Sequence, residues 1–298
     1  MDTVLGKTDK LGRTLMHEHL TIDLSAKKDA DANLNDDEAM IEDMETLKAH
    51  GIDTIVDVTN LGMGRDIARM IAISERSGIN VVAATGFYKT TFFPKMVYEK
   101  NVEELSTFMI NEIINGIDKT EIKARIIGEI GTSQDAFTNE EKKVFQAAAY
   151  AHKITGVPIT THTTLGKLGL KQIELFEKNG VDLEKVIIGH VDLNPDIDYY
   201  LKILEKGCYI GFDTIGKNSY QPDTLRASNL CKLIERGYAS RIVLSLDITR
   251  KSQLKKYGGY GRSYILESFV PMLLRNGINQ KDIDMMMIEN PRRVFGGR

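Results

Sequence analysis

The residue types best suited to chemistry begin with two histidines that stand two positions apart near the start of the chain. His17 and His19 follow a short strand-like run at 14–16. Residues i and i+2 of a β-strand point to the same face, so the two imidazoles could hold one metal ion between them. An H-x-H pair is frequent by chance. Its weight therefore depends on further ligands at matching places downstream.

Such ligands do follow, each at the end of an apolar, strand-like run. With the first pair they make four histidines and two carboxylates: His17, His19, Glu129, His162, His190 and Asp247. This nitrogen and oxygen set suits two divalent ions bridged by a carboxylate, with Zn²⁺ the first choice and Mn²⁺ or Co²⁺ as other candidates. The other two histidines, His50 and His152, fall in helical patterns, where we expect surface or packing roles.

The elements that must position these residues form a repeated unit: a helical pattern, a glycine, then a short apolar run. Helical patterns cover 36–50, 65–77 and 139–155, and Thr138 with Glu141 reads as a capping box for the last of them. Glycine is favoured just past a helix C-terminus because it adopts positive φ without a Cβ clash. Eight runs are predicted strands: 13–17, 52–58, 80–86, 125–130, 157–162, 186–190, 208–213 and 242–247.

This alternation predicts an α/β protein with a (β/α)₈ barrel. Most of the runs are continuously apolar, as in parallel strands buried on both faces. A doubly wound open sheet is the alternative, and it is less favoured because no G-x-G-x-x-G follows the first strand. No linker-like or low-complexity segment interrupts the pattern, so we predict one domain over residues 1–298. In a barrel the carboxyl ends of the strands meet at one mouth, which would bring the six ligands together.

Composition narrows the classes of partner. The chain has a net charge of −3 and no basic block, which argues against nucleic acid and against a charged membrane surface. No run has the roughly 20 apolar residues that a bilayer requires. The two cysteines, Cys208 and Cys231, are far apart, and the polar N-terminus lacks the apolar segment of a secretory signal. We therefore expect a cytoplasmic enzyme with a small-molecule substrate.

Three segments carry a resemblance to a known family. They are 14–19 (TLMHEH), 128–133 (GEIGTS) and 247–252 (DITRKS). In this order, and over nearly the whole chain, the sequence resembles the phosphotriesterase family of the amidohydrolase superfamily, most closely its branch of phosphotriesterase homology proteins. The resemblance implies a (β/α)₈ barrel with two zinc ions, and it also suggests a homodimer.

The resemblance further assigns the ligands to the two ions. His17, His19 and Asp247 would bind the buried ion, and His162 and His190 the more exposed one. Many members of the family bridge the ions with a carboxylated lysine at the end of the fourth strand, where this chain has Glu129. A glutamate can bridge two ions without CO₂ but is shorter, so metal spacing and substrate preference could differ. Phosphotriesterase activity is therefore not carried over.

The ligand set predicts hydrolysis. A water or hydroxide that joins Glu129 in bridging two Zn²⁺ ions has its pKa lowered from about 16 towards neutrality, and an ion can polarise a carbonyl or phosphoryl oxygen. We assign catalytic roles to Asp247, as proton acceptor, and to Glu129, as the bridge. The leading substrate is a lactone or carboxylic ester. A phosphoric ester remains open because both reactions use the same metal site, and a non-catalytic metal-binding barrel is the alternative from another class.

Residues after the last two strands suggest an anionic substrate. Lysines and arginines cluster there with tyrosines, although the whole protein is slightly acidic. Similar loop cations in phosphotriesterase-related sugar lactonases engage a substrate phosphate, which suggests a phosphorylated sugar among the candidates. The predicted substrate-binding residues are Lys217, Arg250, Lys251 and Tyr260, with Tyr88 from the loop after the third strand.

Overall fold

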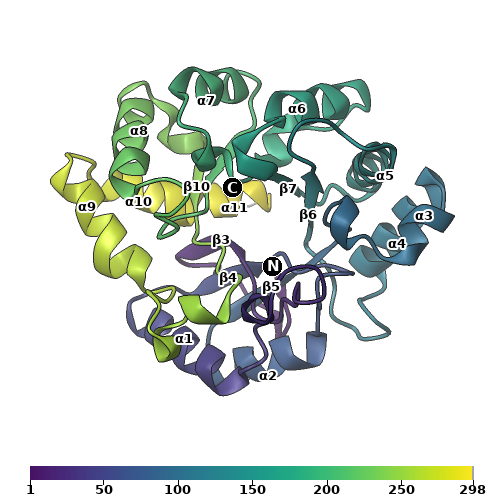
Figure 1. The fold of residues 1–298 in the computed structure, drawn as a ribbon, viewed down its shortest axis with the longest axis horizontal. Helices are drawn as coiled ribbons and strands as arrows, with labels where there is room; N and C mark the ends of the chain where they lie inside the picture. Colours follow the sequence, from purple (N-terminus) through teal and green to yellow (C-terminus); the bar gives the residue numbers. More distant parts are fainter. Residues whose placement is uncertain (297–298) are drawn as a thin grey trace.

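Eight parallel strands form a barrel in the computed structural model, which describes residues 1–296 (Figure 1). Each strand pairs in parallel with the next along the chain, and the last lies beside the first, which closes the barrel. The α/β barrel predicted from the sequence is confirmed, and the open sheet is wrong. The strands are β3 (Thr14–Glu18), β4 (Thr54–Asp57), β5 (Asn80–Thr85), β6 (Ile126–Thr132), β7 (Ile159–Thr163), β8 (Val186–Ile188), β9 (Tyr209–Phe212) and β10 (Ile242–Leu244).

Helices surround the barrel in chain order, as the colours of Figure 1 show. Eight of them fill the seven crossovers, with two in the crossover from β5 to β6, because parallel neighbours need a long connection. These are α1 (Asp37–Ala49), α2 (Ile67–Ser77), α3 (Lys95–Glu99), α4 (Val102–Ile114), α5 (Asn139–Thr155), α6 (Gly169–Lys178), α7 (Ile197–Leu204) and α8 (Asp223–Glu235). After β10 come α9 (Val270–Arg275), α10 (Gln280–Asp284) and α11 (Asn290–Val294), and an antiparallel pair, β1 (Asp2–Thr3) and β2 (Gly6–Lys7), precedes the barrel.

Local signals in the sequence set the helix ends. The predicted capping box is present in α5, where the Thr138 hydroxyl accepts from the Glu141 amide and the Glu141 carboxylate accepts from the Thr138 amide. Gly156 then ends the same helix with a left-handed φ of 70°. Two orphan amides are satisfied at one end, and the turn at the other end suits glycine. The predicted boundaries of this helix are those observed.

The apolar core has two parts on either side of the strands. The larger part fills the space between the barrel and the helices and includes Leu15, Ile55 and Ile127. The smaller part lies inside the barrel, with Leu11 and Val294 joining side chains from the strands: Met16, Val56, Val82, Ala84, Ile126, Ile187, Tyr209 and Val243. Layers of strand side chains fill a barrel of this type. The interior is therefore packed, and only its C-terminal mouth is left for chemistry.

Candidate metal centre and active site

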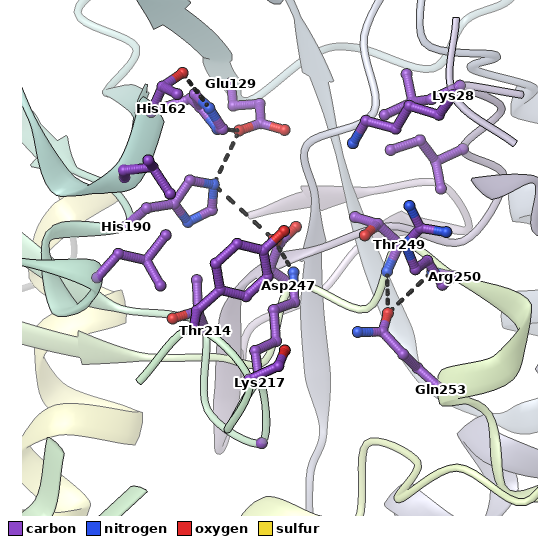
Figure 2. A pocket seen from close by; sticks show the side chains of 18 of the residues that line it. Lys28, Glu129, His162, His190, Thr214, Lys217, Asp247, Thr249, Arg250 and Gln253 are labelled. Atoms are coloured by element: carbon purple, nitrogen blue, oxygen red, sulfur yellow. Dashed lines mark hydrogen bonds and ion pairs between the residues drawn. The ribbon is translucent and has the colours of Figure 1, made fainter. Parts of the chain in front are cut away.

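The six predicted metal ligands meet at the C-terminal mouth of the barrel, around the carboxylate of Glu129. Glu129 Oε2 lies 3.4 Å from His17 Nε2, 3.1 Å from His162 Nδ1 and 3.4 Å from His190 Nε2. Its other oxygen, Oε1, lies 3.4 Å from His19 Nε2. His19 Nε2 is also 3.2 Å from Asp247 Oδ1. One buried carboxylate thus faces all four imidazoles (three of these residues are labelled in Figure 2).

Irregular pairing in two strands turns His17 and Glu129 towards this centre. Met16 and Ile126 belong to the core inside the barrel, so strict alternation would point the odd-numbered neighbour His17, and likewise Glu129, outward. The register of β3 shifts between Leu15 and Glu18, and that of β6 shifts between Ile127 and Ile130. Irregularities of this kind redirect side chains beside active sites.

Unusual backbone conformations place other ligands. His190 and Asp247 have left-handed φ values of 57° and 52°, which cost a non-glycine residue of the order of 1–3 kcal/mol. Gly128, with φ of 143°, precedes Glu129, and a Cβ there would lie 2.3 Å from the carbonyl oxygen of Thr160. Only glycine allows the backbone before Glu129 to pass so close to β7.

Among the residues that the structure describes, potential ligand atoms form three groups: one contains His17, His190 and Asp213, and the other two together contain the six predicted ligands and share only Glu129. Of these two, His17, His19, Glu129 and Asp247 form one group, and Glu129, His162 and His190 form the other, each with ligand atoms within 4.8 Å of one another. In addition, both ring nitrogens of His17 and Nε2 of His19 are buried and make no well-oriented hydrogen bond, although carboxylate oxygens lie 3.2–3.5 Å away. Buried polar atoms are normally hydrogen-bonded, so these unpaired nitrogen atoms are what is expected of metal ligands in the absence of the ion. The residues present therefore fit two divalent ions with nitrogen and oxygen ligands.

Outer hydrogen bonds orient two of the imidazoles. His190 Nδ1 lies 2.8 Å from Asp213 Oδ1, and His19 Nδ1 lies 2.9 Å from Thr59 Oγ1. Each contact leaves Nε2 free to face the centre, which is how partners of metal-binding histidines commonly act. The sequence analysis assigned no role to Asp213 or Thr59. For Asp213 a signal existed, because it follows β9 directly as the ligands follow their strands.

A buried ionic network fixes the loop that carries Asp247. Glu18, the last residue of β3, accepts hydrogen bonds from Ser245 Oγ at 2.7 Å and from the amides of Leu246 and Asp247 at 2.9 and 3.3 Å. Arg262 donates to Glu18 from Nε at 2.9 Å and to Asp43 from Nη1 at 2.8 Å. The network therefore ties the backbone on both sides of Asp247 to β3.

The charges of the centre favour cations. Burial disfavours ionised Glu129, but His17 and the other imidazoles hold its pKa well below its usual range. Burial likewise opposes a charged Asp247, yet the neighbouring Lys217 ammonium and His19 hold the pKa of this carboxyl well below its usual range. His19, despite the opposing effect of burial, has its pKa raised to about 9 by Asp247 and Glu129. Two ionised carboxylates thus stand among the histidines, as a divalent ion requires.

A cavity of about 700 Å³ opens above the centre, and Glu129, His162, His190 and Asp247 lie among its lining residues (Figure 2). Of the predicted substrate-binding residues, four also line it: Tyr88, Lys217, Arg250 and Tyr260. Lys251 does not. Its Nζ lies 5.9 Å from the centre of the Tyr257 ring instead. The structure adds two lysines that the sequence analysis did not single out, Lys28 and Lys89.

Two of the cations in the cavity are already paired with carboxylates. Lys217 Nζ contacts Asp247 Oδ2, so it lies directly beside the centre. Arg250 Nη1 lies 2.7 Å from Asp29 Oδ1 and 3.5 Å from Asp31 Oδ2, on the loop after β3.

The two remaining histidines lie outside the metal centre. His50 contacts Glu267 near the end of α1, and His152 packs in α5 with Nδ1 2.8 Å from the Val157 carbonyl.

This barrel and site define a metal-dependent hydrolase, and comparison with known proteins identifies the family. A profile of the Phosphotriesterase family matches residues 1–295. The chain belongs to the phosphotriesterase family. Within residues 1–296, no helix is long and apolar enough to cross a membrane.

Named relatives cover nearly the whole chain. The phosphotriesterase homology protein of Escherichia coli (strain K12) is 47% identical, covering 96% of this chain and 99% of its own length. The N-acetyltaurine hydrolase of Bos taurus is 32% identical over 98% of this chain and 97% of its own. An aryldialkylphosphatase of Saccharolobus solfataricus is 34% identical, with coverages of 96% and 95%. The family members are hydrolases.

Solved structures agree with the fold in detail. The crystal structure of the Escherichia coli protein, complexed with phosphate in its active site, superposes with a TM-score of 0.94 at 47% identity and covers 97% of this chain and all of that one. The lactonase Lmo2620 from Listeria monocytogenes also gives 0.94, at 30% identity, over 100% of this chain and 99% of its own. Relatives with the same barrel thus act on different bonds.

Proposed function

We propose that this protein is a binuclear zinc hydrolase of ester-type bonds, acting in the cytoplasm on a small lactone or carboxylic ester that carries an anionic group. One observation carries the proposal: the Glu129 carboxylate belongs to two of the three groups of potential ligands in the described part of the chain, and those two groups together contain all six predicted ligands. A shared carboxylate is the arrangement needed to hold two ions at the short spacing of a two-metal hydrolase.

The residues of the chain divide the work. His17, His19 and Asp247 would hold one ion, His162 and His190 the other, and Glu129 would contact both. When bound, the ions supply a water of lowered pKa and polarise the substrate oxygen. Asp247 presents Oδ1 to His19 and Oδ2 to the cavity side, where it contacts Lys217. Asp247 would therefore accept the proton of the attacking water through Oδ2.

Cations near the centre support an anionic substrate. Lys217 and Arg250 line the cavity from the loops that follow β9 and β10, at the end of the barrel where such enzymes bind ligands. Lys217 is now paired with Asp247, and Arg250 with Asp29. A substrate anion would compete for both cations, and a metal ion bound to Asp247 would free Lys217. The phosphate in the active site of the Escherichia coli relative fits the same charge preference.

Two other bonds are supported by the names of relatives. The aryldialkylphosphatase points to a phosphoric ester, and the N-acetyltaurine hydrolase points to the amide of an anionic amine. Because all three bonds would be cleaved by the same metal site, the ligands alone do not rank them.

A substrate screen on zinc-loaded protein tests the proposal. The panel holds a γ-lactone, 4-nitrophenyl acetate, a dialkyl aryl phosphate and N-acetyltaurine, and metal content is measured by mass spectrometry. We expect about two divalent ions per chain and the highest kcat/KM on the lactone or carboxylic ester. Full activity in metal-free protein would refute the metal mechanism. Preference for the phosphate or the amide would replace the ester assignment.

A further inference from the structure

Two cations in the cavity lack the carboxylate partners that Lys217 and Arg250 have. Lys28 lies on the loop after β3 and Lys89 on the loop after β5, and both line the cavity. Within residues 1–296, neither ammonium group has a carboxylate within ion-pair distance. Lys28 is exposed and Lys89 is partly buried, and their like charges repel each other, so an anion bound in the cavity would be attracted to both.

Lys89 is held beside the metal centre by uncharged groups. Its Nζ lies 3.2 Å from His162 Nε2 and 3.0 Å from Thr164 Oγ1. The Thr164 hydroxyl in turn donates to the Thr132 carbonyl, so its oxygen can accept from the lysine, and His162 Nε2 lies 3.1 Å from the same oxygen. These contacts position the ammonium group without neutralising it.

An aromatic pair supports both lysines. Tyr88 and Phe92 stack with ring centres 5.4 Å apart. Lys89 Nζ lies 5.0 Å from the centre of the Tyr88 ring, and Lys28 Nζ lies 5.9 Å from that of Phe92. Cation–π contacts of this kind steady a charge but bring no negative charge with them. In Figure 2 the Lys28 ammonium points into the cavity, across from Glu129 and His162.

We infer that Lys28 and Lys89, the lysine wall, bind an oxyanion group of the substrate beside His162. The inference rests on the proposed function for the class of substrate. It adds the position of the negative charge on that substrate. Ammonium groups are compact charges that accept a carboxylate, a sulfonate or a phosphate. Because Lys89 touches His162, the charged group belongs to the part of the substrate next to the reacting bond.

Sulfate binding tests the lysine wall without any turnover. Isothermal titration calorimetry would compare sulfate binding to the zinc-loaded wild type with Lys28→Met, Lys89→Met and the double variant. Loss of one charge-assisted contact is expected to weaken binding about 10- to 100-fold. Lys27→Met is the matched control, since Lys27 is the neighbouring lysine, is exposed like Lys28 and does not line the cavity. Its sulfate affinity is expected to stay within about twofold of the wild type.

Failure of the wild type to bind sulfate would overturn the inference, and so would unchanged affinity in Lys28→Met and the double variant. Metal content is measured in every variant because Lys89 contacts His162. Lys28 has no such contact with a metal-ligand side chain, so its variant decides the matter even if Lys89→Met loses an ion.

A matched pair of esters then asks whether the bound anion is part of the substrate. The ratio of kcat/KM for mono-4-nitrophenyl succinate to that for 4-nitrophenyl acetate is expected to fall about tenfold or more in Lys28→Met. An unchanged ratio would show that the lysine wall does not select for a negatively charged substrate. If the wild type cleaves neither ester, the proposed ester hydrolysis fails, whereas the sulfate titration still judges the lysine wall.

Discussion

At the scale of single residues, Glu129 is the side chain on which both halves of the centre depend. It faces four imidazoles at 3.1–3.4 Å, and none of those imidazoles makes an equivalent set of contacts. Asp247 has a different position, at the edge of the centre and beside Lys217. The two carboxylates should therefore separate metal binding from proton transfer.

Replacement of Glu129 by alanine should remove metal. The variant loses the only ligand that the two groups of predicted ligands share, so we expect at most one ion per chain and a kcat at least about 10³-fold lower. Metal content is measured by mass spectrometry after dialysis against zinc. Glu103→Ala, an exposed glutamate on α4, is the control and should keep the wild-type content. Two ions in Glu129→Ala would show that this residue is not the bridge.

Asp247→Asn should keep metal and lose rate. Asparagine retains the shape and one oxygen ligand but is a poor proton acceptor, so we expect kcat to fall by roughly 10²–10⁴ with metal content largely unchanged. Steady-state kinetics on the metal-loaded variant checks this. A near-normal kcat would take the proton-transfer role away from Asp247.

At the scale of elements, the loop after β10 is held to β3 by buried charges that never touch a substrate. Glu18 and Arg262 are fully buried, and their contacts span more than two hundred residues of sequence. This network holds Asp247 in its left-handed conformation, because the Asp247 amide itself donates to Glu18. Stability and ligand placement are therefore linked at this point.

Arg262→Met should destabilise the protein strongly. It leaves Glu18 and Asp43 as buried carboxylates without their cation, and removing one partner of a buried pair costs about 3–5 kcal/mol. Arg76→Met breaks the exposed pair with Glu38 and should cost about 0–1 kcal/mol. Urea unfolding of both variants measures the difference. Equal midpoints would mean that the buried network contributes no more than a surface pair.

At the scale of the whole molecule, the barrel brings together ligands that lie in or just after β3, β6, β7, β8 and β10, so two ions bound there would link the ends of five strands. A ligand that binds only the folded state stabilises it by RT ln(1 + [L]/Kd), or about 4 kcal/mol at a thousandfold excess over Kd. Metal should therefore act on the stability of the fold as well as on its activity.

Removal of metal should lower the melting temperature by several degrees, and added zinc should restore it. Differential scanning calorimetry of the chelated and reloaded protein measures the shift. The Glu129→Ala variant should respond less, because its centre has lost the shared ligand. Identical melting curves with and without metal would contradict the prediction that bound metal stabilises the folded protein.

Much of this protein could be predicted from its sequence by local rules. The eight strands were predictable because each is a short apolar run, and α5 because its cap and its terminal glycine are encoded within a few residues. His162, His190 and Asp247 could be placed at the mouth because a position at the end of a strand is a property of the local chain. The strand boundaries were less certain. β4 starts at Thr54, where the apolar pattern starts at 52, because pairing with neighbours decides where a strand begins.

Only the tertiary structure decided what depends on contacts between distant segments. The register shifts that turn His17 and Glu129 inward arise from pairing with neighbouring strands. The contacts of Asp213 and Thr59 with the histidines, and of Arg250 with Asp29, join residues far apart in sequence. Which cations remain unpaired in the cavity follows from such contacts, so Lys28 and Lys89 carry no signal in the sequence. The direction of a side chain along a regular strand is set by covalent geometry. Whether a lysine or arginine is paired with a carboxylate depends instead on which loops pack against each other.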